Sequence, residues 1–366
     1  MNTKTYNCIG LMSGSSLDGL DIAFCRFEWD GKSIVEKKIQ EAETIPFSEV
    51  WKTRLKNLPE QNALVFAKTD VYFGYYMGDL VNNFIKKHQI ESLDFIASHG
   101  HTIFHDPYRR YSIQIGNGAA LAATTEKMVI NEFRLQDVAQ NGEGAPLAPL
   151  ADFYLFPGFD FYMNIGGIAN ISANIANKWL AFDIAPANQI FNFLAQKLDL
   201  EFDSDGKIAE SGTVNIELLE KLQNFDFYQN SYPKSLANEW IGENVLPLFS
   251  NELSVKDQMA TAVELLVQET KNAIERILKN ENFKKSDFKL LVSGGGAYNK
   301  FMIQSLEKEL NKINISISIP EDTTIQFKEA QLIALLGLLR LEEIPNSFPS
   351  VTGARKATIN GAVHLG

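Results

Sequence analysis

Residues 10–21 read Gly-Leu-Met-Ser-Gly-Ser-Ser-Leu-Asp-Gly-Leu-Asp, and an apolar, strand-like run lies on either side of this turn. The pattern predicts a β-hairpin whose tip carries glycine and small hydroxyl residues. Glycine lets the backbone come close to a ligand, and successive N–H groups at such a tip form a concave anion site. The stretch therefore predicts a phosphate-binding hairpin.

A second stretch repeats this pattern. Residues 164–172 read Asn-Ile-Gly-Gly-Ile-Ala-Asn-Ile-Ser, again between apolar runs. Either hairpin alone would also suit an ordinary turn, but two such tips facing each other would hold a polyphosphate between two lobes. The pair indicates a nucleotide-dependent enzyme of the actin, hexokinase and sugar-kinase type.

The commoner phosphate loops do not fit. Gly31-Lys-Ser33 lacks the glycine that a P-loop needs four residues earlier, where Arg26 stands. Gly116-Asn-Gly118 begins like a dinucleotide-binding fingerprint, but Leu121 occupies the third glycine position. The chain after Asp21 is strand-like rather than helical. Neither a P-loop nor a dinucleotide-binding fold is expected.

The composition and net charge restrict the kinds of molecule that this protein is expected to bind. The 366 residues suffice for one large or two medium domains, and 45% hydrophobic with 22% charged residues is ordinary for a globular protein. A net charge of −11 argues against a nucleic-acid partner, which requires a basic footprint. Phosphate would have to be held by backbone dipoles and a divalent metal rather than by a basic surface.

The two cysteines and the N-terminus predict a location. Cys8 and Cys25 fall in neighbouring strand candidates, which suits two core thiols in a reducing compartment. Residues 1–6 have no apolar signal core behind them, and no run approaches a membrane span. We expect a cytoplasmic protein with no membrane partner.

Periodicity divides the chain into an N-terminal lobe, 1–140, and a C-terminal lobe, 141–366. The first lobe is expected to hold strands at 6–11, 21–28, 33–42, 93–98 and 129–131 and a helix at 63–87. The polar, glycine-containing segment 140–146 is the candidate hinge. The second lobe repeats the three-strand opening at 159–164, 170–174 and 178–182, which indicates duplication.

Further elements complete the second lobe. Helices are expected at 187–198, 216–223, 256–278 and 299–310, with strands at 289–293 and 315–319. Thr323 and Gln326 fit a capping box, with Thr323 as the N-cap of an apolar helix through Leu341. As an alternative to lying within the C-terminal lobe, that helix could pack back across the two lobes.

These motifs together resemble the anhydro-N-acetylmuramic acid kinase family, within the actin-like ATPase and sugar kinase superfamily. They run in family order along the whole chain and form a specific set. The matching stretches are Met12-Ser-Gly-Ser-Ser-Leu-Asp-Gly-Leu-Asp21, Ser98-His-Gly100, Phe133-Arg134 with Asp137, Gly144-Ala-Pro-Leu147, Asn164–Ile171, Phe182-Asp183, Ser293-Gly-Gly-Gly-Ala297 with Asn299, Glu329-Ala330 and Val351-Thr-Gly-Ala354.

The resemblance implies an α/β, two-lobed actin-like ATPase (ribonuclease H-like) fold with a duplicated mixed-sheet core and an interlobe cleft. It implies ATP and Mg²⁺ as cofactors, and a homodimer. The implied reaction opens the 1,6-anhydro ring of anhydro-N-acetylmuramic acid with water and phosphorylates the released six-position hydroxyl, in cell-wall sugar recycling.

Site residues follow from the matched motifs. The implied ATP-binding residues are Gly14, Ser15, Ser16, Leu17, Asp18, Gly19, Leu20 and Asp21, then Gly166 and Gly167, and on the adenosine side Gly294, Gly295 and Gly296, between a strand end and a helix N-terminus. The implied sugar-binding residues are His99, His101, Arg134 and Asn188. Asp18 or Asp21 would hold magnesium directly or through water.

Two carboxylates match the family's catalytic positions. Asp183, at the end of a strand candidate, corresponds to the general base that takes a proton from the attacking water. By sequence alone it would equally suit a turn-forming aspartate before Pro186. Glu329 corresponds to the family's active-site glutamate, although a carboxylate near a helix N-terminus is also stabilised by the helix dipole.

Departures from the family pattern cluster on loops that we expect on the substrate side. After Asp183 the family's Thr-Gly-Pro-Gly-Asn is Ile184-Ala-Pro-Ala-Asn188, followed by Asn192 in place of an aspartate. The family's Pro-Lys-Ser-Thr-Gly-Arg-Glu is here Pro233-Lys-Ser-Leu-Ala-Asn-Glu239, and a family glutamine is His101. Two alternatives follow from these changes: a kinase for a related anhydro-sugar, or a nucleotide-binding sensor with altered catalysis.

His99-Gly-His101 also opens a rival reading, because a His-x-His pair can bind zinc in hydrolases and His105 is close by. A catalytic zinc site needs a third ligand fixed by the fold, and no motif surrounds the other histidines. The kinase prediction is therefore preferred.

Overall fold

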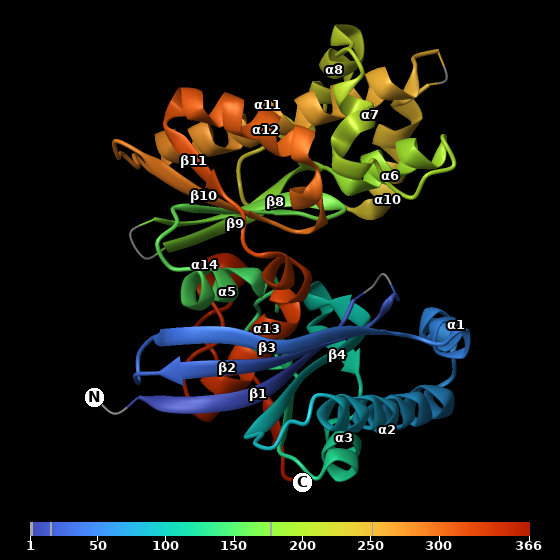
Figure 1. The fold of residues 1–366 in the computed structure, drawn as a ribbon, viewed down its shortest axis with the longest axis vertical. Coiled ribbons are helices and arrows are strands. Elements are labelled where there is room, and N and C mark those ends of the chain that lie inside the picture. The colour runs from blue at the N-terminus through green and yellow to red at the C-terminus, as the bar shows by residue number, and fades with distance from the viewer. Residues whose placement is uncertain (1–2, 15–16, 176–177, 251) are drawn as a thin grey trace. The chain divides into compact units, whose positions relative to one another are not determined.

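The computed structural model describes residues 3–14, 17–175, 178–250 and 252–366 (Figure 1). The chain forms two compact units of mixed α/β structure. The first comprises Met1–Pro157 and Gln326–Gly366, and the second comprises Gly158–Ile325. The second unit is thus one continuous segment inserted into the first.

The sheet of the first unit begins with an antiparallel meander. Its strands are β1 (Lys4–Ser13), β2 (Gly19–Trp29) and β3 (Ile34–Pro46), followed by β4 (Phe95–Asp106), β5 (Tyr111–Ile115), β6 (Val129–Asn131) and β12 (Ala362–His364). The strand order is β12-β6-β4-β1-β2-β3, with β4 parallel to β1 and β6 parallel to β4. The C-terminal strand β12 closes the far edge by pairing with β6.

The sheet of the second unit repeats this plan. Its strands are β7 (Phe161–Ile165), β8 (Ile168–Ile175), β9 (Lys178–Pro186), β10 (Phe288–Ser293) and β11 (Ile315–Ser318). The order is β11-β10-β7-β8-β9, with β7, β8 and β9 antiparallel and β10 and β11 parallel to β7. Both sheets therefore place a three-strand meander beside two parallel strands, and the predicted α/β fold with a duplicated mixed-sheet core is confirmed.

Helices cover the sheets. The first unit has α1 (Glu49–Asn57), α2 (Ala63–Lys87), α3 (Gly118–Thr125), α4 (Leu135–Ala139), α5 (Ala148–Leu155), most of α13 (Asp322–Leu341) and α14 (Pro349–Thr352). The second has α6 (Asn188–Gln196), α7 (Lys207–Glu210), α8 (Ile216–Gln223), α9 (Asp226–Gln229), α10 (Asn238–Trp240), α11 (Val255–Asn280) and α12 (Lys300–Leu310). Among the described residues, no helix has the length and apolar character needed to span a membrane.

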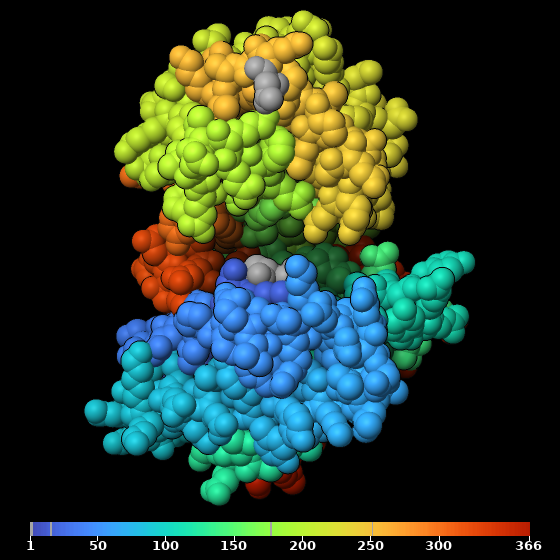
Figure 2. Space-filling view, turned by 90° about the vertical axis from the view of Figure 1, so that its right-hand side faces the viewer, coloured from blue at the N-terminus to red at the C-terminus, as the bar shows by residue number. Residues whose placement is uncertain are grey.

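Helix α2 packs on one face of the first sheet because its apolar residues recur at helical spacing. Phe73, Met77 and Val81 are fully buried and share a core with Ile9 and Ile22 of the sheet. Helices α1 and α2 form a continuous outer surface of this unit in Figure 2 (blue). The other face of the sheet packs on α13.

Cys8 on β1 and Cys25 on β2 lie opposite each other in the antiparallel register. Both are fully buried and both thiols are free, as the sequence predicted. Burial raises the pKa of both thiols, which keeps them protonated and inert. They serve as small core residues.

The predicted lobe boundary at residue 140 differs from the observed division. Residues 141–157 and 326–366 lie with the first unit, because β12 pairs with β6 and α13 packs on β1. The segment 140–146, expected to be the hinge, lies inside the first unit rather than at the division between the units. Hydrogen bonds from the N–H of Glu143 to Thr352 O (2.8 Å) and from that of Gly144 to Asp137 Oδ2 (2.9 Å) tie this segment inside the first unit.

Thr323 is not the N-cap of α13. The N–H of Ile325 donates to Glu321 O at 3.0 Å, so helical bonding already begins with Glu321. Thr323 instead lies inside the first turn. The capping-box pattern correctly predicted that a helix starts here, but it placed the N-cap two residues too late.

Candidate active site

The β1–β2 hairpin provides the first part of the site. Leu17 has φ +61° and its N–H donates to Gly14 O at 3.3 Å, which closes a tight turn. A side chain on Gly19 would place its Cβ 2.4 Å from Ile45 O, so β3 passes against this turn. Two of the residues predicted to bind ATP here, Ser15 and Ser16, lie outside the described residues.

Asp21 is the third residue of the return strand β2 and faces helix α13. Gly10 contacts that helix, since a Cβ on Gly10 would lie 1.8 Å from Ala330 O. Gly10 pairs with Ala23, and residues two apart on a strand share a face, so Asp21 lies on the same face as this contact. Thr44 Oγ1 of the neighbouring strand donates to Asp21 Oδ1 at 2.6 Å. Asp21 is therefore fixed toward α13.

Glu329 of α13 is a carboxylate within electrostatic range of Asp21. Desolvation raises the pKa of Glu329, followed by the charge of Asp21, although the residue keeps an exposed surface. Arg134 acts in the opposite direction and lowers this pKa. The pKa of Asp21 is likewise raised, first by burial and further by Asp18, while the Thr44 hydrogen bond lowers it. Asp21 thus lies within electrostatic range of both Asp18 and Glu329.

Arg134 connects this cluster to β4. Its Nε donates to His99 Nε2 at 2.9 Å and its Nη1 donates to Gly144 O at 2.7 Å. Because His99 Nε2 accepts, the proton of the neutral ring is on Nδ1, 3.1 Å from Gly100 O. Desolvation, then Arg134, lowers the pKa of His99 to about 3. His99 is a buried, neutral acceptor that orients the guanidinium.

The remaining histidines of this strand have hydroxyl partners. His101 Nδ1 lies 3.0 Å from Ser13 Oγ, and His105 Nδ1 lies 2.9 Å from Ser112 Oγ. Desolvation lowers the pKa of both rings. Within the described residues there is no group of three histidine, cysteine or acidic side chains that could hold a metal ion, so the zinc reading has no support.

The β7–β8 hairpin provides a matching turn in the second unit. The carbonyl oxygens of Gly166 and Gly167 accept from the N–H groups of Asn188 (3.0 Å) and Ala187 (2.9 Å). Among the hydrogen bonds of the described part of the chain, none is donated by the N–H groups of these two glycines. The tip therefore directs its carbonyl groups to α6 and keeps two donors for a ligand.

The triple-glycine turn lies directly against this hairpin. Gly294 has φ +86°, and a Cβ there would lie 2.6 Å from Asn164 Oδ1. A Cβ on Gly296 would lie 2.2 Å from Ile165 Cγ2. Asn188 joins the group, since its Nδ2 donates to Ile165 O at 3.3 Å. The structure thus brings together the predicted residues of the second hairpin, the triple-glycine turn and Asn188.

The helix after this turn, α12, begins at Lys300 with Asn299 as its N-cap, which agrees with the predicted helix at 299–310 to within one residue. Gly295 and Gly296 begin a 3₁₀ turn, Gly295–Tyr298, that precedes α12, and Asn299 Oδ1 accepts from the N–H of Met302 at 3.0 Å. The N-terminus of α12 is therefore capped by its own side chain. The role of the triple-glycine turn on the adenosine side stays a prediction, since it lies between the end of β10 and this capped helix start.

Asp183 is held on β9 by an adjacent segment of chain. Its N–H donates to Lys234 O at 3.0 Å, and the N–H of Leu236 donates to its Oδ2 at 2.8 Å. Among the described contacts, Oδ1 has no hydrogen bond. Burial raises the pKa of Asp183 and the Leu236 N–H lowers it. One carboxylate oxygen is fixed, and the other is available to a substrate.

The substitutions after Asp183 are accommodated in the core. Ile184 is 2% exposed, and Ala185 and Ala187 are fully buried in the hydrophobic core of the second unit. Ala187 has φ −132°, so this position does not require glycine. Asn192 is exposed on α6. The two alanines therefore affect packing rather than the lining of a pocket.

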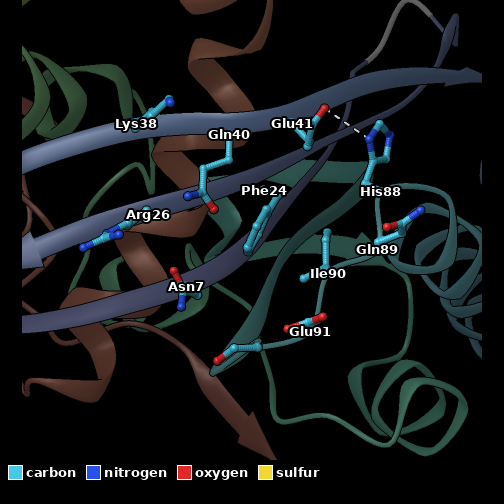
Figure 3. Close-up of a pocket in the computed structure, with 11 residues that line it drawn as sticks. Asn7, Phe24, Arg26, Lys38, Gln40, Glu41, His88, Gln89, Ile90 and Glu91 are labelled. Atoms are coloured by element: carbon cyan, nitrogen blue, oxygen red, sulfur yellow. Dashed lines mark ion pairs between the residues drawn. The ribbon is translucent and has the colours of Figure 1, made fainter.

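A surface groove of about 510 Å³ in the first unit lies away from these residues (Figure 3). Its walls come from β1, β2, β3 and the segment after α2, and include Arg26, Lys38, Glu41 and His88. Phe24 lies within it on the sheet face that packs on α2. It contains none of the predicted site residues and is not part of the candidate site.

Sequence reasoning missed three contributors to the site. Thr44 was predictable in principle, because the meander pairs it with Asp21. Asn164 contacts Gly294 from the strand before the second hairpin, and it belonged to a matched motif without a role. The backbone N–H of Leu236 has no side-chain signature.

The chain is similar to known proteins over almost its whole length. A family model described as anhydro-N-acetylmuramic acid kinase matches residues 6–366. The chain is 32% identical to the protein of that name from Haemophilus influenzae, covering 99% of each. It is 33% identical to the one from Sulfurovum sp., covering 100% of each.

Among solved structures, the chain is similar to the activator of the 2-hydroxyisocaproyl-CoA dehydratase from Clostridium difficile with bound ADPNP. The identity is 14% and the TM-score 0.45, over 92% of this chain and 96% of that chain.

Proposed function

The chain belongs to the anhydro-N-acetylmuramic acid kinase family, and from this premise we propose that it converts 1,6-anhydro-N-acetylmuramic acid and ATP to N-acetylmuramic acid 6-phosphate and ADP. The reaction serves cell-wall sugar recycling. The observation that supports the mechanism most directly is the carboxylate of Asp183, fixed at Oδ2 and available at Oδ1.

Ring opening and phosphoryl transfer are one linked sequence. Asp183 takes a proton from water, and the water oxygen forms a bond to the anomeric carbon. The bond from that carbon to the six-position oxygen breaks, and the electron pair remains on this oxygen. The oxygen then attacks the γ-phosphorus, and the bond to the leaving ADP breaks. The carboxyl group of Asp183 carries the proton away.

The binding residues are proposed from the family motifs and their surroundings in each unit. For the phosphates we propose Gly14, Leu17, Asp18, Gly19, Leu20 and Asp21 with Ser15 and Ser16, and Gly166 and Gly167, with Gly294, Gly295 and Gly296 on the adenosine side. For the sugar we propose His99, His101, Arg134 and Asn188. The Arg134 guanidinium, oriented by His99, suits the lactyl carboxylate of the sugar. Glu329 is the second catalytic carboxylate.

Magnesium fits the carboxylates of the first unit. Mg²⁺ is commonly held by one or two carboxylates together with phosphate oxygens and water, and Asp18 and Asp21 lie close enough to influence each other electrostatically. These two residues would hold the ion, which neutralises charge on the transferred phosphate. The protein is further proposed to act in the cytoplasm. It is also proposed to be a homodimer, and light scattering after gel filtration tests this by measuring the molar mass of the assembly.

The sensor alternative is not favoured. Its motives were the substitutions Ala185, Ala187 and Asn192; the two alanines are buried core residues, and Asn192 is exposed on α6. Asp183 and Glu329 are both retained. A coupled assay for ADP release with anhydro-N-acetylmuramic acid separates the two functions. Turnover supports the kinase. Tight ATP binding without turnover on any anhydro-sugar refutes the kinase and supports the sensor.

The role of Asp183 is tested by Asp183→Asn, which keeps the size and the acceptor for Leu236 but removes the basic oxygen. Turnover is expected to fall by roughly two to four orders of magnitude. ATP binding, measured by isothermal titration, is expected to stay nearly unchanged. A variant that retains more than about a tenth of wild-type turnover would remove Asp183 from this role and make Glu329 the better candidate.

A further inference from the structure

A cluster of charged and aromatic side chains in the second unit has no part in this mechanism. Phe182, Tyr228, Lys234, Glu269 and Arg276 surround a space of only about 10 Å³. That is about the volume needed for one water molecule, so the cluster does not hold a substrate. Its contacts are made to the chain itself.

Lys234 is the central cation. Its Nζ donates to Phe227 O at 2.8 Å and lies 4.2 Å from the centre of the Phe227 ring and 5.9 Å from that of Tyr228. Desolvation, then Arg276, lowers the pKa of Lys234 to about 8. Removing an ammonium group from water is costly, and the carbonyl and the two rings offset this cost. The side chain is therefore held in one place.

The chain around Lys234 is held at further points. Arg276 Nη1 donates to Asn230 O at 2.9 Å. The Tyr232 hydroxyl donates to Glu281 Oε1 at 2.9 Å, and its ring stacks on Phe182 with centroids 5.0 Å apart and planes 8° apart. Residues 230–236 are thus fixed against β9 and α11.

This same segment holds the proposed base. Lys234 accepts from the N–H of Asp183, and Leu236 donates to Asp183 Oδ2, so both ends of Asp183 are bound by residues 234 and 236. The ammonium group of Lys234 anchors the residue whose carbonyl makes the first of these bonds. A shift of the segment would release the carboxylate from its one fixed hydrogen bond.

We propose that Lys234 is a positioning residue for Asp183, acting through the backbone of residues 234–236. The proposal rests on the general-base role given to Asp183 above. In this proposal, the segment of residues 234–236 controls the rate of turnover. The departures from the family pattern at residues 233–239 had instead suggested that this segment controls which sugar is bound.

The test is Lys234→Met, which keeps the length of the side chain and removes the charge and the donor. We expect kcat to fall about 10- to 100-fold, because small misplacement of a reacting group costs this much, with the KM for ATP unchanged within about twofold. The acid limb of the kcat/KM profile should move to higher pH, since losing the Leu236 hydrogen bond removes the contact that lowers the pKa of Asp183.

Lys197→Met is the matched control. Lys197 Nζ also donates to a backbone carbonyl, that of Phe249, at 2.8 Å and lies 4.9 Å from the Phe193 ring, but its contacts do not reach Asp183. Equal losses of kcat in the two methionine variants would overturn the proposal, because they would report a general loss of stability. Lys234→Arg should keep kcat within about fivefold, since arginine can donate to the same carbonyl and stack on the rings.

The double variant Lys234→Met with Asp183→Asn separates the proposal from its premise. If Lys234 acts through Asp183, the double variant loses no more activity than Asp183→Asn alone. Additive losses, or wild-type kcat with an unshifted acid limb in Lys234→Met, would overturn the positioning role and leave Asp183 in place. Near-wild-type activity of Asp183→Asn alone would overturn the premise itself.

Discussion

Gly10→Ala tests whether strand β1 fixes the helix that carries Glu329. A Cβ at this position would lie 1.8 Å from Ala330 O and 2.9 Å from Ala334 N, and real Cβ atoms essentially never come within 3.0 Å of another heavy atom. The difference between 3.0 and 1.8 Å requires a displacement of at least 1.2 Å. Both crowded atoms belong to the helix backbone, so no side chain can rotate away.

The displacement has two consequences of different size. Overpacking of this kind costs about 1–3 kcal/mol of unfolding free energy, and the rigid partners place this substitution at the upper end. Glu329 directly precedes Ala330, and misplacing a catalytic group by about 1 Å can lower turnover about 100-fold. We therefore expect a folded but weakened protein with strongly reduced kcat.

Urea denaturation and a coupled ADP-release assay measure the two effects. Gly242→Ala is the control, because a Cβ there meets no atom within 4 Å, and it should stay within about 0.5 kcal/mol of wild type. Wild-type stability and wild-type kcat in Gly10→Ala would refute the reasoning. Reduced stability with unchanged kcat would show that the contact does not position Glu329.

Three further predictions follow from the charges of the first unit. Glu329→Gln should lower kcat with little change in urea stability, because the side chain is partly exposed and its pKa is raised; a large stability loss would indicate a structural role. Between pH 6.5 and about 3, His99 binds a proton only in the unfolded chain, so lowering the pH should reduce the unfolding free energy of the wild type. The reduction should exceed that of His99→Asn by up to about 1.4 kcal/mol per pH unit. Urea denaturation that gives the same pH dependence for both proteins would contradict this. Chelation of divalent cations should weaken ATP binding in isothermal titration, and Asp21→Asn should reduce that dependence; metal-independent binding would exclude Asp18 and Asp21 as ligands.

Local features of the fold were predictable because they depend on neighbouring residues. The helix at 63–87 and the strand at 129–131 lie where apolar spacing placed them. Both meanders followed from short connections between alternating strands. The glycines of the second hairpin and the triple-glycine turn were identified by residue type, since few other residues allow such close approach.

Other features depend on contacts between distant residues. The division into units was missed because the helical segment Asp322–Leu341 begins in the second unit and continues in the first, with a kink at Phe327 just after the division that no glycine or proline marks in the sequence. The contact of Gly10 with Ala330 joins residues at opposite ends of the chain. The hydrogen bond from Leu236 to Asp183 uses a backbone group that every non-proline residue has.

The insertion of the second unit into the first has a consequence for biosynthesis. The second unit, Gly158–Ile325, is complete as soon as its last residue is free to fold, whereas β6 has to wait for β12 at Ala362–His364. At about 5–20 residues per second, the ribosome needs roughly 10–40 s to add the chain that separates Pro157 from β12. Through that interval the half-built first sheet exposes an unpaired edge and the face that α13 will cover. The nascent N-terminal part is therefore where chaperones would be needed, although it was translated first.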